Sequence, residues 1–397
     1  MAHPASHDAL VAQVAPIAAI TLFGISLSMS YPLFGLLLER MGASGALIGI
    51  NTTAAAITMV AGAPMMPAIL RRIGIGPLMT GAAVALTVSM LAIPLYQGFW
   101  YWTGLRLIYG LAGTVLFFAT AYWIVAAAPE LSRGRIIAIY ALCVSGGFAL
   151  GPLILSLTGL DGTLPFAVAA AVMLIGLAPI LWGLSSAPET GSEDPPSPFA
   201  ALGVFLTDPG VVFAVVLFGT IEFGALALIA VWGVRSGLSE PDAALLLSVF
   251  AFGAMLLQLP LGWAADRFDR RRVLAMVAAG STIAPLAMIV AGSSFWLMAA
   301  AAAFWGAVSV GLYSVALTEI GARYRGARLA VANAAIILAY GIGALISPVM
   351  FGLAMDAIPP DGLLIASAVL ALAYLILMLI RIARARIPRN PLTGPGR

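Results

Sequence analysis

Two charged residues, Arg106 and Glu222, lie deep inside long apolar runs of this sequence. Charges in such surroundings are costly, and they are kept where they bind a substrate or move a proton. An arginine stays protonated, so Arg106 can hold an anion or act on a neighbouring carboxylate, but it cannot carry the proton itself. Glu222 can gain and lose a proton, which predicts a coupling role. A static salt bridge or an interhelical hydrogen bond is the structural alternative for Glu222.

A sparse set of polar and aromatic side chains shares these apolar runs and completes the predicted cavity. Buried amides need hydrogen-bond partners, and a tyrosine combines an apolar ring with a polar hydroxyl. Beside Arg106 and Glu222, the predicted coupling and substrate residues are Tyr31, Asn51, Tyr109, Gln258, Asn333 and Tyr340.

The sequence has few residues of the types that bind metal ions. Both histidines, His3 and His7, lie in the N-terminal tail, and Cys143 is the single cysteine. The sequence therefore predicts no metal site, no cofactor and no internal disulfide. It also contains no nucleotide-binding loop and no nucleophile elbow, so we expect no enzyme.

The apolar runs that must position these residues have the length of membrane-spanning helices. Hydrophobic residues make up 62% of the chain and charged residues 9%, and the mean hydropathy is +1.08. Segments of about 20 apolar residues are long enough to cross a bilayer as helices, in which the backbone satisfies its own hydrogen bonds. We predict an all-α membrane protein whose twelve transmembrane helices fall near residues 13–37, 44–70, 77–96, 99–127, 135–158, 164–185, 211–234, 242–265, 273–292, 294–318, 328–354 and 362–383.

A polar stretch rich in proline and acidic residues, 185–210, separates six of these runs from the other six. Its composition is typical of a linker. We predict an N-terminal six-helix bundle over 1–185 and a cytoplasmic linker over 186–209. The C-terminal bundle and a short basic tail follow over 210–397.

The distribution of arginine predicts the orientation in the membrane. With both termini in the cytoplasm, 16 of the 19 basic residues fall on the cytoplasmic side, and Arg40 and Arg235 fall outside. Basic residues are enriched in cytoplasmic loops. We therefore predict a multi-pass protein of the cell inner (cytoplasmic) membrane with both termini cytoplasmic.

The two halves of the chain repeat one pattern. Arg133 opens a run that later contains Gly147-x-x-x-Gly151-Pro152, and Arg325 opens one that contains Gly343-x-x-x-Ser347-Pro348. Repeats of this kind are typical of transporters built as two halves around a site at the midplane. The residues predicted to permit close helix packing or bending are Gly110, Gly147, Gly151, Pro152, Gly343 and Pro348.

One loop motif carries a family resemblance. The segment Gly262-Trp-Ala-Ala-Asp266-Arg267-Phe-Asp269-Arg270-Arg271-Arg272 resembles the motif Gly-x-x-x-Asp-Arg-x-Gly-Arg-Arg/Lys of the major facilitator superfamily (MFS). Asp269 stands where that family usually has glycine. The first half of the chain contains a degenerate copy of the motif, Pro67-Ala-Ile-Leu-Arg71-Arg72-Ile-Gly74. In this copy Pro67 replaces the first glycine and Arg71 replaces the aspartate. The resemblance implies the MFS fold, two six-helix bundles, with a cytoplasmic gate formed by Gly262, Asp266, Arg267, Arg270 and Arg271. We expect close helix approach at Gly262 and an ion pair or a helix N-terminus as the partner of Asp266.

Two weaker matches concern the coupling ion. The segment Arg106-Leu-Ile-Tyr109-Gly110 resembles the Arg-x-x-x-Gly motif of proton-coupled members of the family, notably drug antiporters. Gly147-x-x-x-Gly151-Pro152 resembles part of the antiporter motif, but Leu155 and Ser156 stand where paired glycines are expected. The resemblance therefore suggests antiport.

These patterns together predict a secondary active transporter that works by alternating access. We predict proton-coupled efflux of small amphipathic or drug-like compounds by a monomer whose partners are its substrate, protons and the lipid bilayer, with no nucleic acid. The alternative is an importer or exporter of a small polar metabolite, such as a sugar or an organic anion, for which Arg106 would be the clamp. The cargo and the direction of transport stay open at this point.

Overall fold

The chain folds into long helices joined by short turns in the computed structural model, which describes residues 4–129, 132–188, 209–292 and 294–386. Within these residues the structure contains helices but no strands. The helices of the first half are α1 (Pro4–Arg40), α2 (Gly45–Gly62), α3 (Met66–Ile73), α4 (Ile75–Ala92), α5 (Phe99–Ala127), α6 (Arg133–Thr158) and α7 (Leu164–Gly183). Those of the second half are α9 (Pro209–Arg235), α10 (Glu240–Arg267), α11 (Arg270–Val290), α12 (Phe295–Arg323), α13 (Gly326–Ala357) and α14 (Gly362–Arg386).

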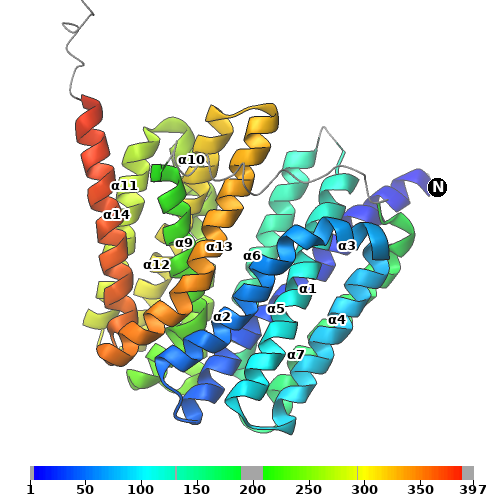
Figure 1. The fold of residues 1–397 in the computed structure, drawn as a ribbon, viewed down its shortest axis with the longest axis horizontal. Helices are drawn as coiled ribbons and strands as arrows, with labels where there is room; N and C mark the ends of the chain where they lie inside the picture. Colours follow the sequence, from blue (N-terminus) through cyan, green and yellow to red (C-terminus); the bar gives the residue numbers. More distant parts are fainter. Residues whose placement is uncertain (1–3, 130–131, 189–208, 293, 387–397) are drawn as a thin grey trace, which may run out of the picture.

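The described residues contain twelve helical segments that are long and apolar enough to cross a membrane. One of them, Gly45–Ile73, comprises α2, a short 3-10 turn and α3. Helices α1–α7 gather on one side of the molecule and α9–α14 on the other (Figure 1). The predictions of an all-α membrane fold, of twelve spans and of two bundles are confirmed. Most of the predicted linker, 189–208, lies outside the described residues.

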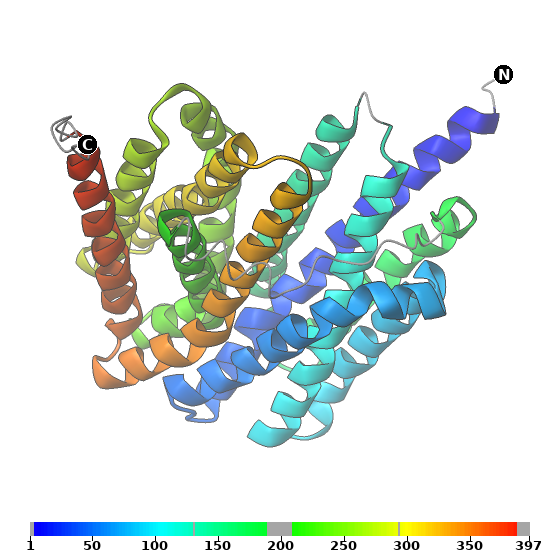
Figure 2. The ribbon, with the colours of Figure 1, turned by 45° about the horizontal axis from the view of Figure 1, so that its top comes forward.

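The two ends of the molecule differ in which turns they carry. Figure 2 shows the start of α1 and the end of α14 at the same end of the molecule, which we call the terminal end. The opposite end, where α1 ends and α2 begins, is the distal end. Because successive spans run in opposite directions, α9 and α13 also finish at the distal end, and α10 begins there.

Side-chain caps begin several of these helices. Ser44 Oγ accepts a hydrogen bond from Leu47 N at the start of α2, and Ser239 Oγ accepts one from Asp242 N at the start of α10. Asp269 caps α11, where its carboxylate accepts bonds from the backbone N–H groups of Arg271 (2.9 Å) and Arg272 (3.3 Å). A carboxylate is favourable at a helix N-terminus. The cap gives a structural reason for an aspartate at position 269, where the loop motif usually has glycine.

Small residues lie where the helices of each bundle approach closely. A Cβ atom at Gly147 would lie 2.5 Å from the carbonyl oxygen of Thr21 in α1, and one at Gly343 would lie 2.5 Å from that of Val216 in α9. Gly151 and Gly110 meet α1 and α2 in the same way, and Pro152 and Pro348 lie inside α6 and α13. The expectation for Gly262 is wrong in this conformation, because a Cβ there would meet nothing within 4 Å.

Candidate functional site

A cavity of about 370 Å³ lies between the two halves, near the middle of the spans. Glu222 of α9 lines it, and the Tyr340 hydroxyl of α13 donates a 2.6 Å hydrogen bond to Glu222 Oε2. The ring of Tyr340 packs against Phe218 and Phe223, with ring centroids 5.9 and 5.6 Å away. The carboxylate is therefore held in place by a neighbouring span while it faces open space.

Aromatic and aliphatic side chains form most of the remaining wall of this cavity. Phe117 and Phe148 contribute from the first half, and Phe250 and Tyr313 from the second. Gln258 adds an amide on the terminal side of Glu222. A wall of this kind suits a cargo with a large apolar surface and few polar groups.

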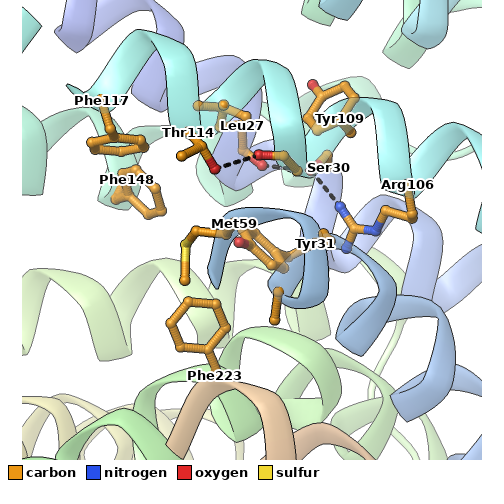
Figure 3. A pocket seen from close by; sticks show the side chains of 14 residues that line it. Leu27, Ser30, Tyr31, Met59, Arg106, Tyr109, Thr114, Phe117, Phe148 and Phe223 are labelled. Carbon is orange, nitrogen blue, oxygen red and sulfur yellow. Dashed lines mark hydrogen bonds between the residues drawn. The ribbon is translucent and has the colours of Figure 1, made fainter. Parts of the chain in front are cut away.

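A second, smaller pocket lies in the first half around Arg106 of α5. It has a volume of about 50 Å³, and its lining includes Ser30, Tyr31 and Tyr109. Figure 3 shows the Arg106 guanidinium reaching toward Ser30 and Tyr31, with Met59 and Phe223 on the opposite side of the pocket. Phe117 and Phe148 line both this pocket and the central cavity, so the two spaces share one wall.

Neutral groups hold the Arg106 side chain, which is 1% exposed. Nε donates to Asn51 Oδ1 (3.3 Å) and Nη1 donates to Ser30 Oγ (2.9 Å). The rings of Tyr31 and Phe34 lie 4.8 and 4.6 Å from the guanidinium carbon, close enough to attract a cation. Nη2 is buried without a hydrogen-bond partner among the described residues.

The predicted site residues thus separate into two groups. Tyr31, Asn51 and Tyr109 gather around Arg106, and Tyr109 donates to the backbone oxygen of Ser26 at 3.3 Å. Gln258 and Tyr340 join Glu222 in the central cavity. Asn333 is exposed and lines neither space. No salt bridge joins Arg106 to Glu222.

Ion pairs between the two halves hold the distal end together, and the sequence did not predict them. Arg235 at the end of α9 pairs with Glu39 of α1 (2.8 Å), and Arg40 pairs with Glu240 of α10 (2.5 Å). Arg40 also pairs with Asp161, which belongs to its own half. Arg40 and Arg235 are the two arginines that the predicted topology places outside. Their unusual position was the one feature of the sequence that could have indicated these ion pairs.

Asp356 at the end of α13 adds a contact of a different type. Its carboxylate accepts hydrogen bonds from the backbone N–H groups of Gly45 (2.7 Å) and Ala46 (2.9 Å), which begin α2 in the other half. It also lies 3.4 Å from Arg235 Nη1. Nearby, a Cβ at Gly45 would lie 2.7 Å from the carbonyl oxygen of Gly352, so α2 and α13 touch backbone to backbone.

The predicted gating loop lies at the terminal end. Asp266 is exposed and forms no ion pair with a described residue, and Arg267 stacks on Trp263. Arg270 pairs instead with Glu319 of α12 (3.0 Å), which also pairs with Arg323 (2.8 Å). All three of these paired residues belong to the second half. The loop therefore makes no ionic contact across the halves in this conformation, as far as the described residues extend.

Comparisons with known proteins agree with this architecture. The model of the Major Facilitator Superfamily matches residues 17–244 and 233–396. An uncharacterized MFS-type transporter of Bacillus subtilis, YfkF, is 29% identical over 65% of this chain and 67% of its own.

Solved structures show the same fold. A bacterial homologue of the human lysosomal transporter Spinster has a TM-score of 0.72 at 17% identity, covering 98% of this chain and 100% of the other. The D-xylose–proton symporter has a TM-score of 0.72 at 15% identity, with 94% and 96% covered.

Proposed function

Because this chain belongs to the Major Facilitator Superfamily, and is thus a membrane transporter and not an enzyme, we propose that it exports small amphipathic compounds in exchange for protons. In this proposal the protein lies in the cytoplasmic membrane and the terminal end faces the cytoplasm, as the arginine distribution favours. The distal end then faces outward, and the conformation described here is closed on that side.

The observation that carries the proposal is the environment of Glu222. Its carboxylate is the titratable acid that faces the central cavity among the residues that line it. A charged carboxylate and a protonated one interact differently with a bound cargo and with the Tyr340 hydroxyl. Loading and release of a proton at this position would therefore link the proton gradient to the binding of cargo.

The contacts between the halves support alternating access. The hydrogen bond from Thr53 to the backbone oxygen of Leu345 and the bond from Ser248 to that of Ala149 both cross the halves on the distal side of Glu222. The ion pairs of Glu39 and Arg40 cross at the distal surface. Cargo would enter from the terminal side, and export requires these contacts to break.

A sugar or another neutral polar metabolite is less well supported as cargo. Such cargo needs several hydrogen-bonding side chains that converge on one space. Of the three predicted amides, Gln258 lines the cavity, Asn51 is engaged with Arg106, and Asn333 is exposed.

Transport in proteoliposomes with an imposed pH gradient tests the proposal. We expect the gradient to drive the movement of lipophilic dyes but not of hexoses, and Glu222→Gln to abolish that dependence. Asp161→Asn is the matched control, because it removes a carboxylate that is 91% exposed and far from the cavity. Dye transport indifferent to the gradient, or unchanged in Glu222→Gln, would refute proton coupling at this residue.

A further inference from the structure

The Arg106 guanidinium is a buried cation that lacks a counter-charge. Its hydrogen-bond acceptors, Asn51 Oδ1 and Ser30 Oγ, are both neutral, and the two rings against it are neutral as well. No carboxylate pairs with it among the described residues. A buried charge left unpaired is strongly unfavourable, so such a group persists where something else supplies the opposite charge.

One nitrogen of the guanidinium, Nη2, has no hydrogen-bond partner among the described residues. It is buried, whereas Nε and Nη1 are engaged. The adjoining pocket of about 50 Å³ exceeds the roughly 10–15 Å³ that one water requires, so it has room for a small polar group. Ser30 and Tyr109 place hydroxyl groups in the same lining.

The wall beyond the guanidinium is apolar, and part of it also lines the central cavity. Phe117 and Phe148 line both spaces, and their rings pack together with centroids 5.8 Å apart. Met59 and Phe223 add further apolar surface beside the pocket. A molecule with its charged group at Arg106 would therefore meet apolar side chains with the rest of its surface.

We propose that Arg106 binds the anionic group of the cargo, and that the cargo is an amphipathic organic anion bearing a carboxylate. This inference rests on the transport function proposed above and names its substrate class. Arginine recognises carboxylates through parallel N–H···O bonds, and here Nη2 supplies the free donor. Asn51 is a positioning residue, since its amide oxygen accepts from Nε while Nη2 has no hydrogen-bond partner among the described residues.

Binding to purified protein in lipid nanodiscs, with no pH gradient, tests the inference directly. The probes are three pairs of a carboxylate and its uncharged amide: benzoate and benzamide, 2-naphthoate and 2-naphthamide, octanoate and octanamide. We expect at least one carboxylate to bind about tenfold or more tightly than its amide, as a charge-assisted bond predicts. Equal affinities within all three pairs would overturn the inference.

Two variants assign the preference to Arg106. In Arg106→Gln the preference for carboxylate over amide should fall to about one, while the amide still binds along the unchanged aromatic wall. Arg106→Lys keeps the charge without the planar fork, and it should retain part of the preference. The inference is overturned if Arg106→Gln binds amides as the wild type does and still prefers the carboxylate. Arg106→Lys also provides a folded comparison if Arg106→Gln is unstable.

The outcome separates this inference from the proposed function. A carboxylate preference that depends on Arg106, without gradient-driven transport of these probes, supports the anion site and refutes proton-coupled export. Gradient-driven transport of neutral and cationic dyes, without any carboxylate preference, supports the export function and refutes the anion site.

Discussion

At the scale of single residues, the neutral partners of Arg106, more than its burial, indicate a role in binding an anion. Asn51 offers the guanidinium an acceptor without a charge, and its own Nδ2 donates to Thr103 Oγ1 at 3.2 Å. An aspartate at this position would keep the acceptor and add the missing negative charge. The amide therefore leaves Arg106 available for an external anion.

This arrangement predicts that Asn51→Asp stabilises the protein and abolishes carboxylate binding. A charged acceptor strengthens a hydrogen bond by about 1–2 kcal/mol over a neutral one, and a buried pair is better compensated than a lone cation. We expect a higher Tm and a carboxylate-to-amide preference near one, measured by thermal unfolding and ligand titration. Thr103→Val is the control, since it removes the other partner of Asn51 without adding charge. A lower Tm combined with retained preference would contradict the prediction.

Glu222 and Tyr340 permit a second prediction at this scale. Tyr340→Phe removes the hydroxyl that donates to Glu222 but keeps the ring that packs on Phe218. A hydrogen bond to a charged group contributes about 1.5–3 kcal/mol, so we expect gradient-driven transport to slow about tenfold or more. Initial rates in proteoliposomes measure this effect.

Tyr313→Phe is the matched control for that variant. Tyr313 lines the same cavity and packs 6.3 Å from the ring of Tyr340, but it makes no hydrogen bond to Glu222 among the described contacts. Its transport rate should stay close to that of the wild type. Equal slowing in both variants would mean that the cavity tolerates no change of shape, and that the hydroxyl of Tyr340 has no special role.

Much of the candidate site could be predicted from the sequence, because isolated charges and amides stand out in apolar runs. Arg106, Glu222, Tyr340 and Gln258 all line one of the two spaces. Asn333 could not be placed, because its direction from the helix depends on how α13 packs against its neighbours. The unpaired Nη2 of Arg106 was also beyond prediction, since a partner's absence is a property of packing.

At the scale of elements, the contact between α2 and α13 forms the centre of the distal closure. The two helices touch at Gly45 and Gly352, and Asp356 of α13 caps the N-terminus of α2. The sequence gives no hint of this cap, because Gly45 and Asp356 are separated by 311 residues. The spans themselves were predictable, since their hydrophobicity and length are local properties of the chain.

Asp356→Asn should therefore open the distal end. The change removes the charge that interacts with the α2 N-terminus and with Arg235, which we expect to cost the closed conformation about 1–3 kcal/mol. Spin labels at Leu95 and Trp296, which are 79% and 80% exposed at the distal ends of the two halves, report the separation. The labelled protein requires Cys143→Ser, since Cys143 is the single cysteine.

Asp161→Asn again provides the comparison for this element. Asp161 pairs with Arg40 inside the first half and does not cross to the second. The distance between the labels should lengthen in Asp356→Asn and stay unchanged in Asp161→Asn. Equal distances in both variants would show that the cap does not contribute to closure.

At the scale of the whole molecule, each end carries an aspartate near the end of a helix, and the two aspartates differ in their contacts. The Asp356 carboxylate at the distal end is engaged with the other half, while the Asp266 carboxylate at the terminal end is exposed and makes no ion pair with a described residue. A residue can shift a conformational equilibrium only if it interacts differently with the two states. Asp266 should therefore stabilise the opposite conformation, in which the terminal end is closed.

This difference predicts that replacing Asp266 and replacing Asp356 change the label distance in opposite directions. Asp266→Asn should shift the population toward the conformation described here, and the Leu95–Trp296 label distance should move toward its shorter value. Asp356→Asn should lengthen it. The double variant should return close to the wild-type distribution, because effects at sites far apart add when no partner is shared. Lengthening in Asp266→Asn, or a double variant that matches either single one, would show that the two ends are not coupled through one equilibrium.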